Sequence, residues 1–139
     1  MTDDSGRADG SLREAAFEAM ENAYAPYSRF RVGAAVRTSG GGIVTGCNVE
    51  NAAYGEALCA ERVAVAAAVA SGVREFEEIA IASESDEPAP PCGSCRQTMS
   101  EFAPDLQVTS YTKNGREATW RLSDLLPEAF GLNHLRGRE

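Results

Sequence analysis

The chain has 139 residues and a formal net charge of −8 at pH 7, and 43% of its residues are hydrophobic and 24% charged. This length suits one compact domain, and no apolar run approaches the roughly 18 residues that a membrane-spanning helix needs. Binding to a phosphate backbone depends on Lys and Arg displacing counterions, so the acidic balance argues against a nucleic-acid partner. We therefore expect a globular protein that binds neither nucleic acid nor a membrane.

The two ends of the chain are expected to be tails around one domain at residues 11–135. Residues 1–10 are polar and acidic and lack the charged start and apolar stretch of a secretory signal. We therefore expect a flexible N-terminal tail, a short C-terminal tail at 136–139, and a cytoplasmic protein. Thiols stay reduced in that compartment, so the four cysteines indicate metal or redox chemistry more than disulfides.

The spacing of apolar residues predicts three main helices. Ser11 and Glu14 have the form of a capping box, which places the first helix at about 12–24. The nearly continuous Ala and Val of 58–70 predict a buried helix that ends at a glycine. A third helix is expected from 92 to about 102.

Five short segments are predicted to be strands, because they are rich in β-forming residues or alternate apolar with polar ones. They lie at 30–36, 43–49, 78–83, 107–111 and 118–122. The Asn114-Gly115 pair predicts a tight turn between the last two strands, and Ser123 is expected to cap a last short helix. This order of elements indicates an α/β domain with a mixed sheet between helices.

Three cysteines lie at predicted helix starts, where the helix dipole lowers thiol pKa and favours the thiolate that binds metal. Cys92 and Cys95 share one face of a first turn, so their sulfur atoms can bind one ion. Cys59 is the expected third ligand, because the only histidine, His134, lies near the C-terminus. Three protein ligands leave one position of a tetrahedral zinc open for water, which is the pattern of a catalytic site.

Charged residues next to these cysteines fit a reactive metal. Arg62 and Arg96 are expected to offset the negative charge of three thiolates around one ion. Glu61 follows Cys59 by two residues, so its carboxylate reaches the metal-bound water only if Cys59 lies at the helix start. It would then shuttle protons for a water whose pKa the metal lowers from about 15.7 towards about 7. Two alternatives without a metal stay open. The arginines could form ordinary surface ion pairs, and Glu61 could simply interact with the dipole at the helix start.

Several short segments between residue 12 and about residue 135 form a recognisable set. They are Ala25-Pro26-Tyr27-Ser28, Phe30-Arg31-Val32-Gly33-Ala34-Ala35, Asn48-Val49-Glu50-Asn51, Tyr54-Gly55, Cys59-Ala60-Glu61-Arg62, Pro91-Cys92-Gly93-Ser94-Cys95-Arg96-Gln97, Leu125-Leu126-Pro127 and Phe130-Gly131. With this set the chain resembles the small, homotetrameric zinc-dependent cytidine deaminases. The combination is far more specific than any one of these motifs. It implies a three-layer α-β-α sandwich with a mixed, roughly five-stranded sheet and one zinc ion per subunit.

The resemblance also implies an activity, in which cytidine, and 2′-deoxycytidine too, is hydrolysed to uridine or deoxyuridine plus ammonia in pyrimidine salvage. Glu61 would be the catalytic proton carrier, and Cys59, Cys92 and Cys95 the zinc ligands. The implied substrate contacts are Asn48 and Glu50 on the ribose hydroxyls, Phe30 on the base, and the Ala60 backbone with Glu61 on the pyrimidine edge. Tyr54 and Phe130 would complete the site of a neighbouring subunit in a homotetramer.

Other interpretations stay open from the residues alone. Cys47 matches no ligand position, but it would close a structural site of four thiolates if it joined the other three. The Cys92 and Cys95 pair also suits a redox dithiol protein. An aminonucleoside-antibiotic deaminase would share the metal motifs but is not expected to contain Asn48-Val49-Glu50-Asn51. The acidic, lysine-poor composition fits a salt-rich cytoplasm as well as ordinary solubility through net charge.

Overall fold

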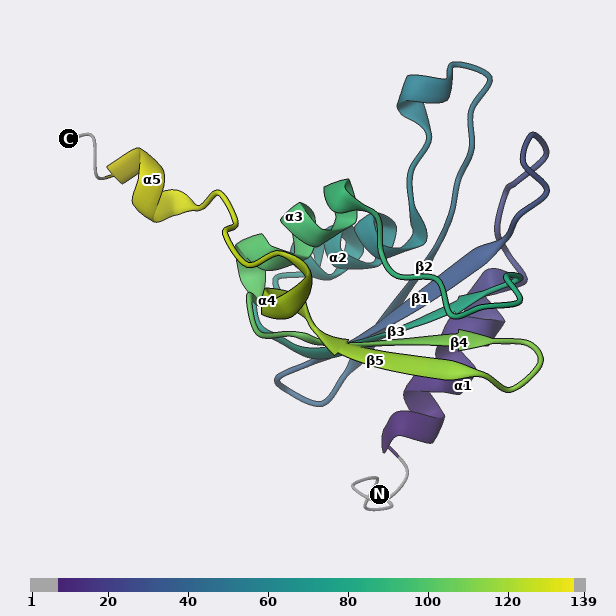
Figure 1. The fold of residues 1–139 in the computed structure, drawn as a ribbon, viewed down its shortest axis with the longest axis horizontal. Coiled ribbons are helices and arrows are strands. Elements are labelled where there is room, and N and C mark those ends of the chain that lie inside the picture. The colour runs from purple at the N-terminus through teal and green to yellow at the C-terminus, as the bar shows by residue number, and fades with distance from the viewer. Residues whose placement is uncertain (1–7, 137–139) are drawn as a thin grey trace.

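A mixed five-stranded sheet in the order β2-β1-β3-β4-β5 forms the middle layer of the fold (Figure 1). The structure is a computed structural model that describes residues 8–136. The strands are β1 (Val32–Thr38), β2 (Ile43–Cys47), β3 (Phe76–Ser83), β4 (Gln107–Thr112) and β5 (Glu117–Arg121). Only β3 and β4 pair in parallel among these strands. The prediction of a mixed, roughly five-stranded sheet is confirmed.

Helices cover both faces of this sheet, as the three-layer prediction requires. The helices are α1 (Ala8–Met20), η1 (Tyr54–Glu56), α2 (Ala60–Ala70), α3 (Gly93–Phe102), α4 (Leu122–Leu125) and α5 (Leu132–Arg136). α1 packs on one face of the sheet, while α2 and α3 pack side by side on the other. None of the helices in the described range is long and apolar enough to cross a membrane.

Alternation along the strands divides the core between the two faces. Val36 and Ile79 pack with the α2 and α3 residues, whereas the neighbouring Ala35 and Ala80 pack with α1. Successive side chains of a strand point to opposite faces, so one run of apolar residues serves both layers. The alanines on the α1 side allow a close helix, and the larger side chains on the other side fill the space under two helices.

The structure differs from the sequence prediction at the ends of several elements. α1 begins at Ala8, so Ser11 lies inside the helix and the predicted capping box there is wrong. Leu12, which is 1% exposed, marks the start of the buried face and not the start of the helix. The predicted tail at 1–10 is therefore helical from Ala8, and residues 1–7 lie outside the described residues, as do 137–139.

Two further boundaries are set by long-range backbone bonds that no local pattern reveals. α1 ends at Met20 and not near Tyr24, because the backbone of Tyr24 pairs with that of Asn48 and Glu50. The last short helix begins at Leu122, whose N–H donates to the Leu106 carbonyl, so Ser123 lies inside α4 and does not cap it.

Gly46 lets α2 approach the sheet more closely than any other residue would. A Cβ atom at this position would lie 2.5 Å from the Ala64 nitrogen and 2.8 Å from the Ala60 oxygen, both backbone atoms of α2. A rigid helix backbone cannot yield locally, so a side chain would push the first turns of α2 outwards. That part of α2 follows directly after Cys59.

We predict that Gly46→Ala lowers the free energy of unfolding by about 1–3 kcal/mol, the usual range for overpacking a close contact. Urea unfolding followed by circular dichroism measures this change. Gly40→Ala is the matched control in the same hairpin, because its Cβ would meet only the Thr38 side chain, at 4.0 Å. The control is expected to stay within about 0.5 kcal/mol of the unmodified chain. Equal stability of the two variants would contradict the close packing of α2.

Candidate active site

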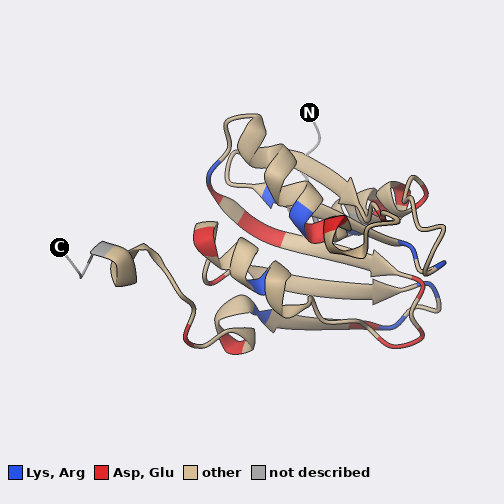
Figure 2. Ribbon diagram, turned by 90° about the horizontal axis from the view of Figure 1, so that it is seen from above, with Lys and Arg blue, Asp and Glu red and all other residues tan. Residues whose placement is uncertain are grey.

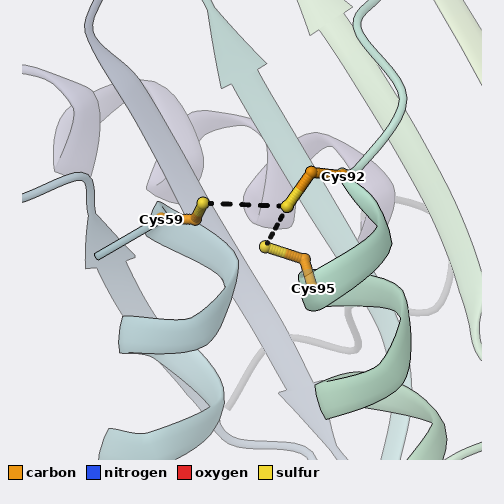
Figure 3. Close-up of side chains that lie close together, drawn as sticks. All are labelled: Cys59, Cys92 and Cys95. Atoms are coloured by element: carbon orange, nitrogen blue, oxygen red, sulfur yellow. Dashed lines mark hydrogen bonds between the residues drawn. The ribbon is translucent and has the colours of Figure 1, made fainter. Parts of the chain in front are cut away.

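The starts of α2 and α3 bring three sulfur atoms together (Figure 3). Cys59 is the residue that precedes α2 and Cys92 the residue that precedes α3, both with extended backbone, and Cys95 lies in the first turn of α3. The Cys92 Sγ atom is 3.9 Å from the Cys59 Sγ and 3.4 Å from the Cys95 Sγ. All three sulfur atoms lie within 4.8 Å of one another.

This triangle of sulfur atoms fits a zinc ion. Zn–S bonds of about 2.3 Å in a tetrahedron place the sulfur atoms about 3.8 Å apart, close to the separations found here. The three side chains differ in exposure, since Cys95 is buried, Cys59 is half-buried and Cys92 is exposed. An ion bound by the three sulfurs would therefore remain accessible from the Cys92 side.

Cys47 does not belong to this group, which comprises Cys59, Cys92 and Cys95 among the described residues. Its neighbour Gly46 faces α2, so alternation along β2 turns the Cys47 side chain towards the opposite face, where α1 lies. Its cross-strand partner Gly33 likewise faces α1. Burial raises the pKa of Cys47, as expected of a thiol in apolar surroundings. The geometry therefore does not favour a closed site of four thiolates.

Contacts among the thiols shift the pKa values of Cys59 and Cys95. Hydrogen bonds from the thiols of Cys95 and Cys92, together with the charge of Arg62, lower the pKa of Cys59 to about 5 against an opposing effect of burial. The pKa of Cys95 is raised, because its thiol donates to Cys59 and is buried. One thiolate thus forms readily, and an incoming cation has to displace the remaining protons.

Glu61 lies beside the sulfur triangle and lines the same cavity as Cys59 and Cys92. Because Cys59 caps the helix with extended backbone, Glu61 occupies the irregular first turn of α2 and can face the same cavity as Cys59. Its side chain is 6% exposed. Burial, and to a lesser degree the charge of Cys59, raises the pKa of Glu61 to about 7. A carboxyl group with such a pKa can both accept and donate a proton near neutral pH.

The two arginines have different surroundings. The charge of Arg62 stabilises the Cys59 thiolate, and its NH2 group also donates to the Ala57 carbonyl at 3.0 Å. Arg96 donates from Nε to the Pro91 carbonyl at 2.8 Å and from NH1 to the Leu125 carbonyl at 2.9 Å. Arg96 therefore anchors the segment before Cys92, which its place next to Cys95 in the sequence does not reveal.

A cavity of about 330 Å³ opens next to Cys59, Cys92 and Glu61. Its size lies at the lower end of small-molecule sites. Phe30, Asn48, Glu50 and Ala60 also line it, so the structure brings together most of the residues expected to contact a substrate. Val32, Ile81 and Pro90 make much of the remaining wall apolar.

Two polar side chains of this cavity are held in place by backbone groups. Asn48 accepts a hydrogen bond from the Val32 N–H at 2.8 Å and donates to the Phe30 carbonyl at 2.9 Å. The Glu50 carboxylate accepts hydrogen bonds from the N–H groups of Tyr27 and Ser28, each at 3.0 Å, and from the Ser28 hydroxyl. These donors, with the Ser28 hydroxyl the strongest, lower the pKa of Glu50, so its carboxylate is charged at neutral pH.

Two of the residues expected to contact substrate do not line the cavity. Tyr54 is 79% exposed on η1, and Phe130 is 58% exposed in the segment between α4 and α5. Both segments project from the body of the molecule in Figure 1. Within the described chain these two aromatic rings are therefore available for contacts outside their own subunit.

Ser28 is a cavity residue that the sequence analysis left without a role, although it lies in one of the matching segments. Its side chain lines the cavity and binds Glu50. Ser83 and Ala89 also line the cavity, from the end of β3 and the loop after it. These two residues belong to no recognised motif, and only the folded chain brings them next to Phe30.

Comparisons with known proteins agree with this geometry. Residues 7–110 match the family model described as cytidine and deoxycytidylate deaminase zinc-binding region. The cytidine deaminase of Halalkalibacterium halodurans is 44% identical over 120 residues, which span 86% of this chain and 91% of that protein. The cytidine deaminase of Mycobacterium tuberculosis is 43% identical over 124 residues, or 89% of this chain and 90% of that one.

A solved cytidine deaminase structure has the same fold as this chain. The crystal structure of cytidine deaminase from Burkholderia pseudomallei has a TM-score of 0.85 at 49% identity, and the match covers 87% of this chain and 98% of that chain. Both metal-binding segments lie inside the range matched by the family model. The chain therefore belongs to the cytidine and deoxycytidylate deaminase family with a zinc-binding region, and it is a hydrolytic deaminase.

Proposed function

We propose that this chain hydrolyses free cytidine and 2′-deoxycytidine to uridine and deoxyuridine, with release of ammonia, as a step of pyrimidine salvage in the cytoplasm. The observation that carries the proposal is the single cavity that joins the sulfur triangle and Glu61 to Phe30, Asn48 and Glu50. The cavity thus combines reactive groups with an aromatic ring and polar groups suited to a base and a sugar.

The reaction exchanges the amino group of the pyrimidine for the oxygen of water. Zinc held by Cys59, Cys92 and Cys95 would supply a Lewis acid that lowers the pKa of water in its open position. Glu61 takes one proton from the attacking water and delivers it to ring N3 as the oxygen bonds to C4. Glu61 then carries the second proton to the amino nitrogen, the C4–N4 bond breaks, and ammonia leaves.

The remaining residues orient the nucleoside for this attack. The Phe30 ring, which is 38% exposed, packs on the base, and the backbone of Ala60 at the start of α2 meets the pyrimidine edge together with Glu61. Asn48 keeps an N–H and a lone pair for the ribose after its two bonds to β1 and the segment before it. The Arg62 charge offsets that of the thiolates, and Arg96 holds the segment before Cys92 through the Pro91 carbonyl.

We predict that Glu61→Gln lowers kcat for cytidine by about 10²–10⁴-fold, because the amide keeps the shape of the side chain but can neither accept nor release a proton near neutral pH. Zinc content, measured by atomic absorption, should stay at one ion per subunit. Cys92→Ala is expected to lose both zinc and turnover, since two sulfur ligands remain. A Glu61→Gln variant with wild-type kcat would overturn the proposed role of Glu61.

Substrate charge should separate nucleosides from nucleotides at this site. The Glu50 carboxylate is ionised at neutral pH and lies in the proposed sugar end of the cavity. A like charge placed close to it costs binding free energy that a neutral sugar does not.

We predict that kcat/KM for cytidine exceeds that for cytidine 5′-monophosphate by about 10²-fold or more at pH 7. Ammonia release with the two substrates measures the ratio. Glu50→Gln removes the negative charge and should bring the kcat/KM values for the two substrates closer together, even though it also weakens cytidine binding. Equal use of the two substrates by the unmodified chain would contradict the assignment of Glu50 to the sugar end.

We also propose a homotetramer in which subunits share their active sites. Large apolar side chains are exposed on the two projecting segments, with Tyr54 at 79%, Phe130 at 58%, Leu132 at 52% and Leu135 at 50%. Exposed apolar side chains gathered on projecting segments are typical of association surfaces. In this assembly Tyr54 and Phe130 of one subunit complete the cavity of another.

We predict that Phe130→Ala lowers kcat/KM by about tenfold, as expected of an aromatic anchor that becomes buried when the subunits associate. Mixing Phe130→Ala with Glu61→Gln subunits, after dissociation and reassembly, should recover activity, because some sites then combine an intact Glu61 with a neighbour's Phe130. A mixture of Glu61→Gln with Cys92→Ala is the control and should stay inactive, since both residues act within one subunit. Failure of the first mixture to recover activity would contradict shared sites.

A further inference from the structure

We propose that the ion pair between Arg31 and Glu84 is a positioning device that holds two walls of the nucleoside cavity at their working separation. The inference rests on the proposed function, because it assigns a role in substrate binding. Neither residue lines the cavity or touches the sulfur triangle. Their effect on the substrate would therefore be indirect.

The pair joins two segments that are far apart in sequence. Arg31 donates three hydrogen bonds to the single carboxylate of Glu84, from its backbone N–H at 2.9 Å, from Nε at 3.1 Å and from NH2 at 2.8 Å. Their side chains are 33% and 24% exposed, so water screens the pair only in part. Several charge-assisted bonds to one carboxylate give a definite geometry that a single surface contact lacks.

The position of the pair continues the pairing of β1 with β3. The last backbone partners of these strands are Val32 and Ser83, so Arg31 and Glu84 are the next residues on each side. Here the carboxylate of Glu84, and not its backbone oxygen, accepts the Arg31 N–H. The side-chain pair thus keeps the ends of β1 and β3 together at the point where their backbone pairing stops.

Each partner is continuous with one wall of the cavity. Arg31 lies between Phe30 and Val32, which both line the cavity. Glu84 follows Ser83 and begins the loop that carries Ala89 and Pro90, which also line the cavity. If the pair were lost, this loop could move away from Phe30 and widen the cavity.

Neighbouring charges support the pair from two other elements. Glu21, just after α1, lies 3.5 Å from the NH1 group of Arg31, and Lys113, in the turn between β4 and β5, lies 3.8 Å from the Glu84 carboxylate. Acidic and basic segments meet at this end of the sheet in Figure 2. The pair is therefore the centre of a small network of alternating charges.

The far end of the same loop has an independent anchor. Arg96 binds the Pro91 carbonyl, next to Cys92, at 2.8 Å. Loss of the Glu84 charge would therefore loosen the start of the loop and leave the sulfur triangle in place. A change confined to ground-state binding raises KM, whereas disturbance of the reacting groups lowers kcat.

The test is Glu84→Gln, which keeps the size of the side chain and removes its charge. We expect the KM for cytidine and the Kd for uridine, measured by calorimetry, to rise about five- to tenfold together, with kcat within about twofold and zinc content unchanged. Arg31→Gln should give the same pattern, and the double variant should be no worse than either single variant, because both changes break one interaction.

The matched control is Glu87→Gln, which breaks another ion pair of the same loop. Glu87 pairs with Arg116 at 2.6 Å, but these side chains are 78% and 56% exposed and lie outside the cavity. Exposed pairs of this kind contribute little, so KM and the uridine Kd should stay within about 1.5-fold of the wild-type values.

Several outcomes would overturn the proposal. Wild-type constants for Glu84→Gln, or a fall in kcat and zinc content without a change in KM or in uridine binding, would exclude a positioning role for the pair. Additive effects of Arg31→Gln and Glu84→Gln would also exclude it, because the two residues would then act separately. A wild-type chain that neither deaminates cytidine nor binds uridine would overturn the proposed function, and the positioning role with it.

Discussion

The convergence of two helix starts on one point is the constraint on which the rest of the site depends. Cys59 and Cys92 precede α2 and α3, and these helices lie side by side on the same face of the sheet. The bare backbone of Gly46 allows α2 its close approach, since a Cβ there would meet the helix backbone. A shift of either helix by one or two ångströms would separate the sulfur atoms beyond the reach of one ion.

The same helix start decides what Glu61 can do. A residue two positions after a ligand faces away from it on a regular helix, but the extended backbone of Cys59 removes that conflict. Burial then favours the protonated carboxyl group, while the charge of a bound cation favours the ionised one. A group balanced between these two influences can exchange protons with a substrate in both directions, which the exchange of an amino group for oxygen requires.

The metal ligands could be predicted from sequence because their chemistry depends on local features, namely two short motifs at helix starts and the absence of another suitable ligand. The place of Glu61 in the first turn of α2 could be predicted for the same reason, and its role as proton carrier stays a prediction. Arg96 shows the limit, since its neighbour Cys95 suggested a role beside sulfur, yet its hydrogen bonds go to the carbonyls of Pro91 and Leu125. The pairing of Arg31 with Glu84 has no local signature at all, because 53 positions separate the two residues and only the sheet brings them together.

The residues proposed for the reaction and those proposed for substrate binding thus lie on different kinds of structural element. The sulfur triangle and Glu61 lie at the starts of helices packed against a sheet, where side chains have little freedom and small displacements are costly. The groups assigned to the sugar and the base lie on connecting segments, and each needs its own anchors, such as the three donors that hold Glu50 and the two backbone bonds of Asn48. Connecting segments tolerate substitution more readily than packed helices do. Substrate preference can therefore change in this fold while the metal centre stays the same.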